Sequence, residues 1–311
     1  MDILYIVIGL VLLILGGDWL LKGAVNLASK LQISKVIIGM TIVSFATSAP
    51  ELIVSIKSAI NGYQDLALGN VIGSNIANLA LVLGVTLCLT SISVTKSFYT
   101  LDWPIMMLAS VLLFVFIKFD FTLSRIEGMI LFLILIVFII YLIQQNRKNK
   151  SNMDLDLEET ENSYLKIFFF LILGGVGLWG GSELLINGAV GLATELGISE
   201  RIIGITILSV GTSIPELAAS IIAIVKKEKG ISLGNLIGSN IFNILAVLGI
   251  TSMITPIKVS DLGLITSDVY WMLGIAFVIM PLCLLPKRNA FGIKEGLFLI
   301  STYALFVYFT L

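Results

Sequence analysis

Histidine is absent from this 311-residue sequence, and cysteine occurs only twice. Without histidine the chain lacks the commonest transition-metal ligand and the side chain most used for proton relay near neutral pH. Cys88 and Cys283 both lie within apolar runs, so we interpret them as small buried hydrophobic residues rather than as a disulfide or a metal pair. These absences argue against a metalloenzyme or a thiol enzyme.

Charged residues are also scarce, at 13% of the chain against 58% hydrophobic residues. A soluble domain of this length could not cover so much apolar surface with polar groups, so the solvent that fits is lipid. The net charge of −1 gives no basic excess for nucleic acid. The start of the chain, Met1-Asp2-Ile3, lacks the basic region of a cleaved signal peptide, so we expect the first apolar run to be retained.

Ten apolar segments are long enough to be membrane-spanning helices, which need about 20 mostly apolar residues each. A polar stretch over 147–163 separates five of them from the other five, and we interpret it as a solvated linker. We therefore expect an all-α integral membrane protein with a five-helix repeat over 1–146 and another over 164–311. The predicted spans are 3–28, 34–60, 66–91, 100–118, 122–145, 164–192, 199–225, 231–254, 265–286 and 291–310.

The two halves are copies of each other. LQISKVIIGMTIVSFATSAPEL at 31–52 aligns with LGISERIIGITILSVGTSIPEL at 196–217, within a longer match that has no gap. Because five is an odd number, the second copy must enter the membrane from the opposite side, which gives an inverted-topology repeat. Lysine and arginine are concentrated in the odd-numbered loops, which predicts a cytoplasmic linker and both termini outside the cell.

One motif occurs in both halves, as SFATSAPE at 44–51 and as SVGTSIPE at 209–216. Each copy ends in a proline, which breaks the second helix of its repeat, followed by Glu51 or Glu216. A carboxylate within an apolar span costs at least several kcal/mol, so a function is expected for both. Broken helices also leave carbonyl groups that a cation can satisfy. Hydroxyl ligands at the same level would come from Thr47, Ser48, Thr212 and Ser213.

A second motif is also repeated, as GNVIGSNIAN at 69–78 and as GNLIGSNIFN at 234–243. In each copy a serine and an asparagine four residues apart share one helical face, namely Ser74 with Asn78 and Ser239 with Asn243. The two motifs together supply only oxygen ligands, which suit Ca²⁺ or Na⁺ and not zinc or copper. Two glutamates can neutralise one Ca²⁺ and tolerate two or three Na⁺, as antiport requires.

Structural explanations compete with this interpretation. Ser48 and Glu51 have the spacing of a helix capping box, and the Ser/Asn pairs could be interhelical hydrogen-bond partners. Recurrence of both motifs in the two halves favours an ion site. Asp18 and Glu183 lie near span ends, where we favour snorkelling or structural ion pairs over an ion vestibule. The acidic linker lacks the ligand spacing of a calcium loop.

Together the motifs resemble those of the sodium/calcium exchanger family, within the calcium/cation antiporter superfamily, and the short linker resembles its compact prokaryotic members. The resemblance covers nearly the whole chain. It implies that Glu51 and Glu216 bind Ca²⁺ together with the backbone carbonyls of Thr47 and Thr212, and that Asn78 and Asn243 line the centre. It also implies flanking sodium sites built by Ser44, Thr47, Ser48, Ser74, Ser209, Thr212, Ser213 and Ser239.

The function we expect is secondary active antiport of Na⁺ against Ca²⁺ across the cell membrane by alternating access. The ions are substrates, no cofactor is expected, and the chain is expected to work as a monomer. The alternatives are exchange of H⁺ or of another divalent cation, and K⁺-dependent exchange. Some relatives carry aspartate where this chain has Asn243, so the amide disfavours proton or K⁺ coupling. A channel would need a continuous pore, and a membrane enzyme would need catalytic motifs that the sequence lacks.

Overall fold

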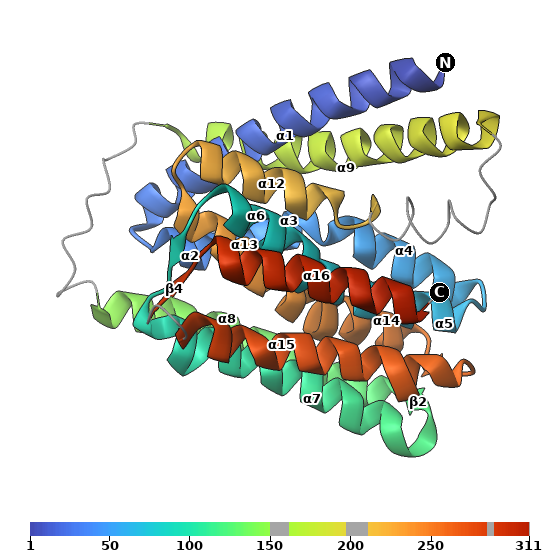
Figure 1. Cartoon of the computed structure of the whole chain (residues 1–311). Coiled ribbons are helices and arrows are strands. Elements are labelled where there is room, and N and C mark those ends of the chain that lie inside the picture. The colour runs from blue at the N-terminus through green and yellow to red at the C-terminus, as the bar shows by residue number, and fades with distance from the viewer. Residues whose placement is uncertain (150–161, 197–210, 285–288, 311) are drawn as a thin grey trace. The chain divides into compact units, whose positions relative to one another are not determined.

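The computed structural model describes residues 1–149, 162–196, 211–284 and 289–310, and this part of the chain is nearly all helical (Figure 1). The expected all-α class is therefore confirmed, with the addition of four two-residue strands. β1 (Ile92–Ser93) pairs antiparallel with β4 (Ala290–Phe291), and β2 (Thr122–Leu123) pairs antiparallel with β3 (Ile257–Lys258). All four strands lie in connections between helices, where they join loops that are distant in sequence.

Within the described residues, eight helices are long and apolar enough to cross a membrane. Three of them run without a change of helix type: α1 (Asp2–Leu31), α9 (Tyr164–Glu195) and α16 (Ile293–Thr310). A fourth, α8, extends over Arg125–Asn149 and so continues into the stretch expected to be a linker. The other four contain a π-helical turn. They are α5–η2–α6 (Gln64–Ile76, Ala77–Val82, Leu83–Leu89), η3–α7 (Phe98–Asp102, Trp103–Asp120), α13–η5–α14 (Lys229–Phe242, Asn243–Leu248, Gly249–Ile254) and η6–α15 (Leu264–Asp268, Val269–Leu284).

The second span of the first repeat is interrupted, as the proline predicts. It consists of α2 (Lys35–Ile38), η1 (Gly39–Val43) and α3 (Ser44–Thr47), followed after one residue by α4 (Ala49–Ile60). Counting this pair as one span gives up to nine candidate spans among the described residues. Its counterpart in the second repeat, expected over 199–225, lies partly outside the described residues. The described part holds α12 (Ile214–Val225).

Two compact units make up the described chain, and each takes segments from both sequence repeats. The first comprises Met1–Thr47 and Ile140–Asn235, and the second comprises Ser48–Ile139 and Leu236–Leu311. The two compact units therefore do not coincide with the two sequence repeats. Each unit is described below by itself.

In the first unit, α1 and α9 pack side by side and antiparallel along their length (Figure 1). Glycines make this approach possible. A Cβ on Gly16 would lie 2.6 Å from the backbone nitrogen of Leu178, and a Cβ on Gly181 would lie 2.8 Å from that of Leu13. These distances leave no room for a side chain, so the two backbones are in direct contact. Small residues at helix contacts are the usual solution in membranes, where lipid tails are as apolar as leucine and close packing must supply the attraction.

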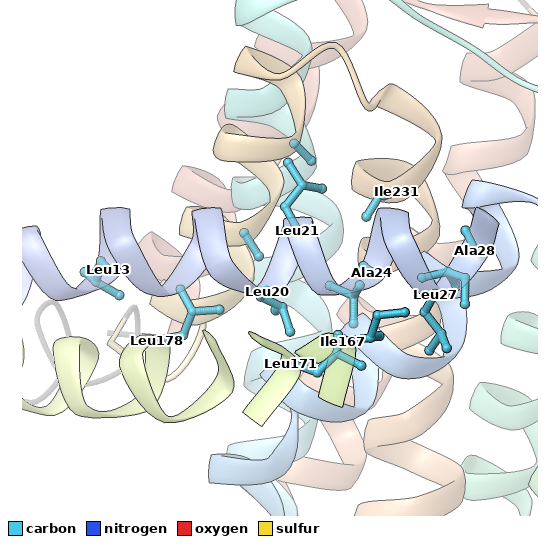
Figure 2. Close-up of a cluster of buried hydrophobic side chains, with 14 residues drawn as sticks. Leu13, Leu20, Leu21, Ala24, Leu27, Ala28, Ile167, Leu171, Leu178 and Ile231 are labelled. Carbon is cyan, nitrogen blue, oxygen red and sulfur yellow. The ribbon is translucent and has the colours of Figure 1, made fainter. Parts of the chain in front are cut away.

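A cluster of buried apolar side chains also lies in this unit (Figure 2). Leu20 and Ala24 of α1 and Leu178 of α9 are 1% exposed or less. Ile231 on α13 belongs to the same cluster. Exposed apolar residues also occur along α1, including Ile3, Leu4, Val7, Leu10, Val11 and Ile14. A helix that buries some leucines and exposes others is suited to a protein surrounded by lipid.

In the second unit, α16 packs against α6, and α15 packs against α7 and α5. Gly84 and Gly296 again allow close contact, since a Cβ on Gly296 would lie 2.7 Å from the carbonyl oxygen of Gly84. The indole Nε1 of Trp103 on α7 donates to the carbonyl of Ala276 on α15 at 2.8 Å. Helix α4 packs against α5 and against the π-helical turn η5. This last contact joins the helix that carries Glu51 to the helices of the second motif.

Candidate ion-binding residues

The helical path is interrupted at the serine that precedes each motif proline. Ser48 has φ −87° and ψ 2° directly before α4, and Ser213 has φ −91° and ψ 5° directly before α12. Proline then stands in the first turn of the new helix, where its missing N–H leaves no hydrogen bond unmade. The near-identical dihedral angles show that the two copies of the motif share a local conformation. Ser209, another predicted ligand, lies outside the described residues.

Both motif glutamates are buried. Glu51 on α4 is 1% exposed and Glu216 on α12 is 0% exposed. The hydroxyl-bearing Ser48 and Ser213 are 3% and 1% exposed, and their Oγ atoms have no hydrogen-bond partner among the described residues. Nearly all buried polar groups in proteins are satisfied, so an orphaned buried oxygen calls for an explanation. A bound cation would explain it, because a cation accepts a lone pair from the oxygen and no hydrogen-bond donor is then needed.

The capping-box explanation can be tested within this protein, because a capping box does form elsewhere. Ser124 Oγ accepts a hydrogen bond from Glu127 N at 3.3 Å, and Glu127 Oε2 accepts one from Ser124 N at 2.8 Å. The same Ser-x-x-Glu spacing at Ser48 and Glu51 gives no side-chain hydrogen bond from Ser48 to its helix. The serine of the first motif is therefore not serving as a helix cap.

In the first unit, a network of neutral groups surrounds the end of α3. Ser44 Oγ donates its proton to the carbonyl of Gly39 at 2.8 Å or of Asn235 at 3.0 Å. Thr47 Oγ1 donates to Asn235 Oδ1 at 3.2 Å or to the carbonyl of Ser44 at 3.3 Å. Asn235 Nδ2 donates to Ser220 Oγ at 3.4 Å. Two predicted ligands thus meet on one asparagine.

Asn235 and Ser220 were not among the residues predicted from the sequence. Both are 0% exposed. A signal for them exists, because each is matched in the first repeat, by Asn70 and Ser55. That second pair is in contact too, with Asn70 Nδ2 donating to Ser55 Oγ at 3.3 Å.

In the second unit, asparagines of the two copies of the second motif are in contact. Asn243 Nδ2 donates to Asn75 Oδ1 at 3.1 Å, and Asn75 Nδ2 donates to the carbonyl of Asn240 at 3.3 Å. Asn243 thereby does serve as an interhelical partner, which the structural explanation predicted. Asn78, its counterpart, does not, since neither polar atom of its buried side chain has a hydrogen-bond partner within the described ranges. The Oδ1 atom of Asn243 is also without one.

The π-helical turns coincide with these asparagines. The turn η2 begins at Ala77, one residue before Asn78, and η5 begins at Asn243 itself. Single π-turns inside α-helices occur often at functional sites. Ser74 and Ser239, the other predicted ligands of this motif, are buried on α5 and α13. Thr212 is half-buried in the turn before α12.

Asp18 forms structural ion pairs, which is one of the two favoured interpretations. Its carboxylate contacts Lys22 Nζ at 2.6 Å and Lys226 Nζ at 2.8 Å, so it ties α1 to the end of α12 in the first unit. Its repeat counterpart Glu183 is exposed on α9. Exposed ion pairs contribute little stability, typically below about 1 kcal/mol each.

A chain with many apolar spans, broken helices and buried oxygen ligands has the features of a membrane ion transporter. The family model described as sodium/calcium exchanger protein matches residues 1–144 and 166–311. The chain belongs to this family. It is therefore a multi-pass membrane antiporter and not an enzyme, and the ions of such exchangers are substrates rather than cofactors.

Individual proteins support the same assignment. The chain is 38% identical to the putative antiporter CaxA of Alkalimonas amylolytica, over 96% of this chain and 95% of CaxA. It is 31% identical to the sodium/calcium exchanger MaX1 of Methanosarcina acetivorans, over 98% and 97% of the two chains. Its fold matches the solved sodium-calcium exchanger NCX_Mj with a TM-score of 0.84, 27% identity and coverage of 99% and 98%. The expected family and its compact prokaryotic type are confirmed.

Proposed function

We propose that this protein exchanges Na⁺ for Ca²⁺ across the cell membrane by alternating access. The observation that carries the proposal is the set of buried oxygen atoms that have no hydrogen-bond partner among the described residues. Four of them are predicted ligands: Ser48 Oγ, Ser213 Oγ, Asn78 Oδ1 and Asn243 Oδ1. Hard cations bind oxygen ligands of this kind.

The charge for a divalent ion would come from Glu51 and Glu216. Each is buried, and each follows a helix interruption with nearly the same dihedral angles. Two carboxylates neutralise one Ca²⁺, whereas three Na⁺ overfill them by one charge. We propose that both glutamates bind the transported cations. The other proposed ligands are Ser44, Thr47, Ser48, Ser74, Asn78, Ser209, Thr212, Ser213, Ser239 and Asn243.

Sodium is preferred over H⁺ and K⁺ as the coupling ion because of the chemistry at Asn243. Its amide donates to Asn75 Oδ1, a bond that an ionised carboxylate in the same place could not make. The chain also has no histidine to relay protons. Exchange of H⁺ or another divalent ion, and K⁺-dependent exchange, are the alternatives that the experiment must separate.

Calcium-45 uptake into proteoliposomes loaded with Na⁺, with and without external K⁺, tests the proposal. We expect uptake driven by the outward Na⁺ gradient, with no need for K⁺, and little uptake when a pH gradient replaces it. Uptake that is driven by the pH gradient and does not depend on Na⁺ would show that H⁺, not Na⁺, is the coupling ion. An absolute K⁺ requirement would favour the K⁺-dependent alternative.

We further propose ten spans in two inverted repeats, with both termini outside and the 147–163 linker in the cytoplasm. The odd number of spans in each repeat and the lysine- and arginine-rich odd loops support this arrangement. Cysteine labelling tests it after Cys88 and Cys283 are replaced. A cysteine at Ser151, which lies outside the described residues, should react with an impermeant reagent only after the cells are opened. A cysteine at the C-terminus should react in intact cells, and the opposite result would reject the topology.

A further inference from the structure

We propose that Asn235 is a positioning residue that orients the hydroxyl groups of Thr47 and Ser44 for a monovalent cation. The proposal rests on the function proposed above and deepens it. It assigns a role to a residue that touches the predicted ligands and is not one of them.

A hydroxyl group has one proton and two lone pairs. To bind a cation it must turn its lone pairs toward the ion, so its proton must be accepted by some other group. In water the hydroxyl rotates freely and its ordering costs free energy when the ion binds. A buried acceptor that already holds the proton removes that cost, which is preorganisation of the site.

Asn235 has the geometry of such an acceptor. Its Oδ1 lies 3.2 Å from Thr47 Oγ1, and its backbone carbonyl oxygen lies 3.0 Å from Ser44 Oγ. Each hydroxyl therefore has an acceptor on Asn235, beside a backbone carbonyl of its own helical segment, that of Gly39 for Ser44 and that of Ser44 for Thr47. Asn235, Ser44 and Thr47 are all 0% exposed, so water does not compete for these bonds.

Ser220 fixes which way the amide of Asn235 faces. Asn235 Nδ2 donates to Ser220 Oγ at 3.4 Å, which leaves Oδ1 on the side of Thr47. Ser220 lies four residues after Glu216 on α12, on the same helical face. The network therefore links the oriented hydroxyls of α3 to the helix that carries a proposed carboxylate ligand.

The amide–serine pair is repeated in the second unit. Asn70 and Ser55 are 15 residues apart, as are Asn235 and Ser220, and the two N–H···O distances are 3.3 and 3.4 Å. Ser55 also follows Glu51 by four residues on α4. The contact occurs in both copies at the same spacing from the glutamate, so it is a structural feature of the repeated motif.

The groups around Asn235 favour a monovalent ion. Thr47, Ser44, Asn235 and Ser220 offer hydroxyl, amide and carbonyl oxygens that carry no formal charge. A divalent ion depends mainly on the charge of its ligands, which the glutamates supply. Loss of hydroxyl orientation should therefore weaken Na⁺ binding more than Ca²⁺ binding.

The test is cation-dependent thermal stabilisation of the purified full-length protein, with NaCl or CaCl₂ titrated at constant ionic strength. For Asn235→Ala we expect the half-saturating Na⁺ concentration to rise on the order of tenfold, the effect of one lost hydrogen bond. The half-saturating Ca²⁺ concentration should change by less than about threefold. Asn235→Asp keeps an acceptor oxygen for Thr47 and should recover most of the Na⁺ response.

A double-mutant cycle separates positioning from a merely structural role. Because Asn235 acts through the hydroxyl, Asn235→Ala combined with Thr47→Val should weaken Na⁺ binding no more than Thr47→Val alone. Thr41→Val is the matched control, since Thr41 Oγ1 donates to the carbonyl of Ile37 in its own helix at 2.7 Å and should leave Na⁺ binding unchanged. If Asn235→Ala does not fold, Ser220→Ala takes its place with a smaller Na⁺ shift, of about threefold.

Three results would overturn the proposal: equal shifts for Na⁺ and Ca²⁺, additive effects in the cycle, or no Na⁺ stabilisation of the wild type. The proposed exchange can fail separately. A wild type that binds Na⁺ with these mutant effects, yet shows no Na⁺-driven calcium flux, would retain the positioning role and reject the exchange function.

Discussion

Replacing either buried glutamate by glutamine, as Glu51→Gln or Glu216→Gln, should reduce Na⁺-driven calcium uptake by at least about 100-fold. Glutamine keeps the volume and one carbonyl oxygen of glutamate but removes the negative charge. Leaving a buried charge without its partner costs about 3–5 kcal/mol, and each 1.4 kcal/mol is a factor of ten. Calcium loses half of its balancing charge in either variant. Uptake is measured in proteoliposomes at matched protein content.

Glu295→Gln is the control for this experiment. Glu295 is also buried, at 8% exposure, but its Oε2 accepts a hydrogen bond from Gly292 N at 2.7 Å at the start of α16. Glutamine can accept the same bond, so calcium uptake should stay near the wild-type rate. All variants must elute as a single monodisperse peak. Wild-type uptake by Glu51→Gln or Glu216→Gln would remove that residue from the set of ligands.

The second large effect is expected for Asn243→Asp, which should make calcium exchange depend on pH. Asn75 Nδ2 donates to the carbonyl of Asn240, so the Asn75 atom that contacts the side chain at position 243 is Oδ1. An ionised carboxylate would face this oxygen with no proton to share, whereas a protonated one could donate to it. Repulsion from the carboxylate of Glu51, whose helix α4 packs against η5, acts in the same direction. A carboxyl at this position should therefore bind a proton more readily than an isolated one.

Exchange by Asn243→Asp should accordingly change on the order of tenfold between pH 6 and pH 8, or come to require K⁺, while the wild type changes much less. The measurement is Na⁺-driven calcium flux across this pH range, with and without K⁺. Asn243→Ala removes the amide without adding a titratable group, so its rate should fall without a new pH dependence. Identical pH profiles for the wild type and Asn243→Asp would show that this position does not set the coupling ion.

The sequence was sufficient to predict the class, most spans and the two glutamates that the fold buries. Long apolar runs identified the spanning helices, and the cost of burying charge in them singled out Glu51 and Glu216. Proline predicted the interruption before α4. These features depend on properties of single residues or of short segments, which the sequence shows directly.

Features that depend on contacts between distant residues were missed. The strand pair Ile92–Ser93 with Ala290–Phe291 joins loops about two hundred positions apart, and nothing local predicts it. The roles of Asn235 and Asn75 depend on which neighbour each amide meets after folding. Both asparagines are matched between the two repeats in the sequence. The glutamates were identified by the free-energy cost of burying a charge, and a neutral amide has no such cost. The π-turns η2 and η5 have no sequence marker of their own.

The helical extent of α8 was underestimated for a different reason. Its polar end, up to Asn149, was assigned in part to the linker because it is too polar to lie in lipid. Glutamine, arginine and lysine are nonetheless good helix formers, so the helix continues past the apolar segment. Polarity marks where a span should leave the membrane, and helix propensity marks where the helix ends.

Na⁺ and Ca²⁺ are proposed to bind to the same two carboxylates. Equilibrium calcium-45 binding to the purified wild-type protein, titrated with NaCl against choline chloride at constant ionic strength, tests this proposal most directly. We expect Na⁺ to displace all specifically bound Ca²⁺, with a displacement curve steeper than that for one competing ion. We also expect Glu51→Gln and Glu216→Gln to bind no calcium at the Ca²⁺ concentration that saturates the wild type. Calcium binding that is unaffected by Na⁺ would contradict the proposal.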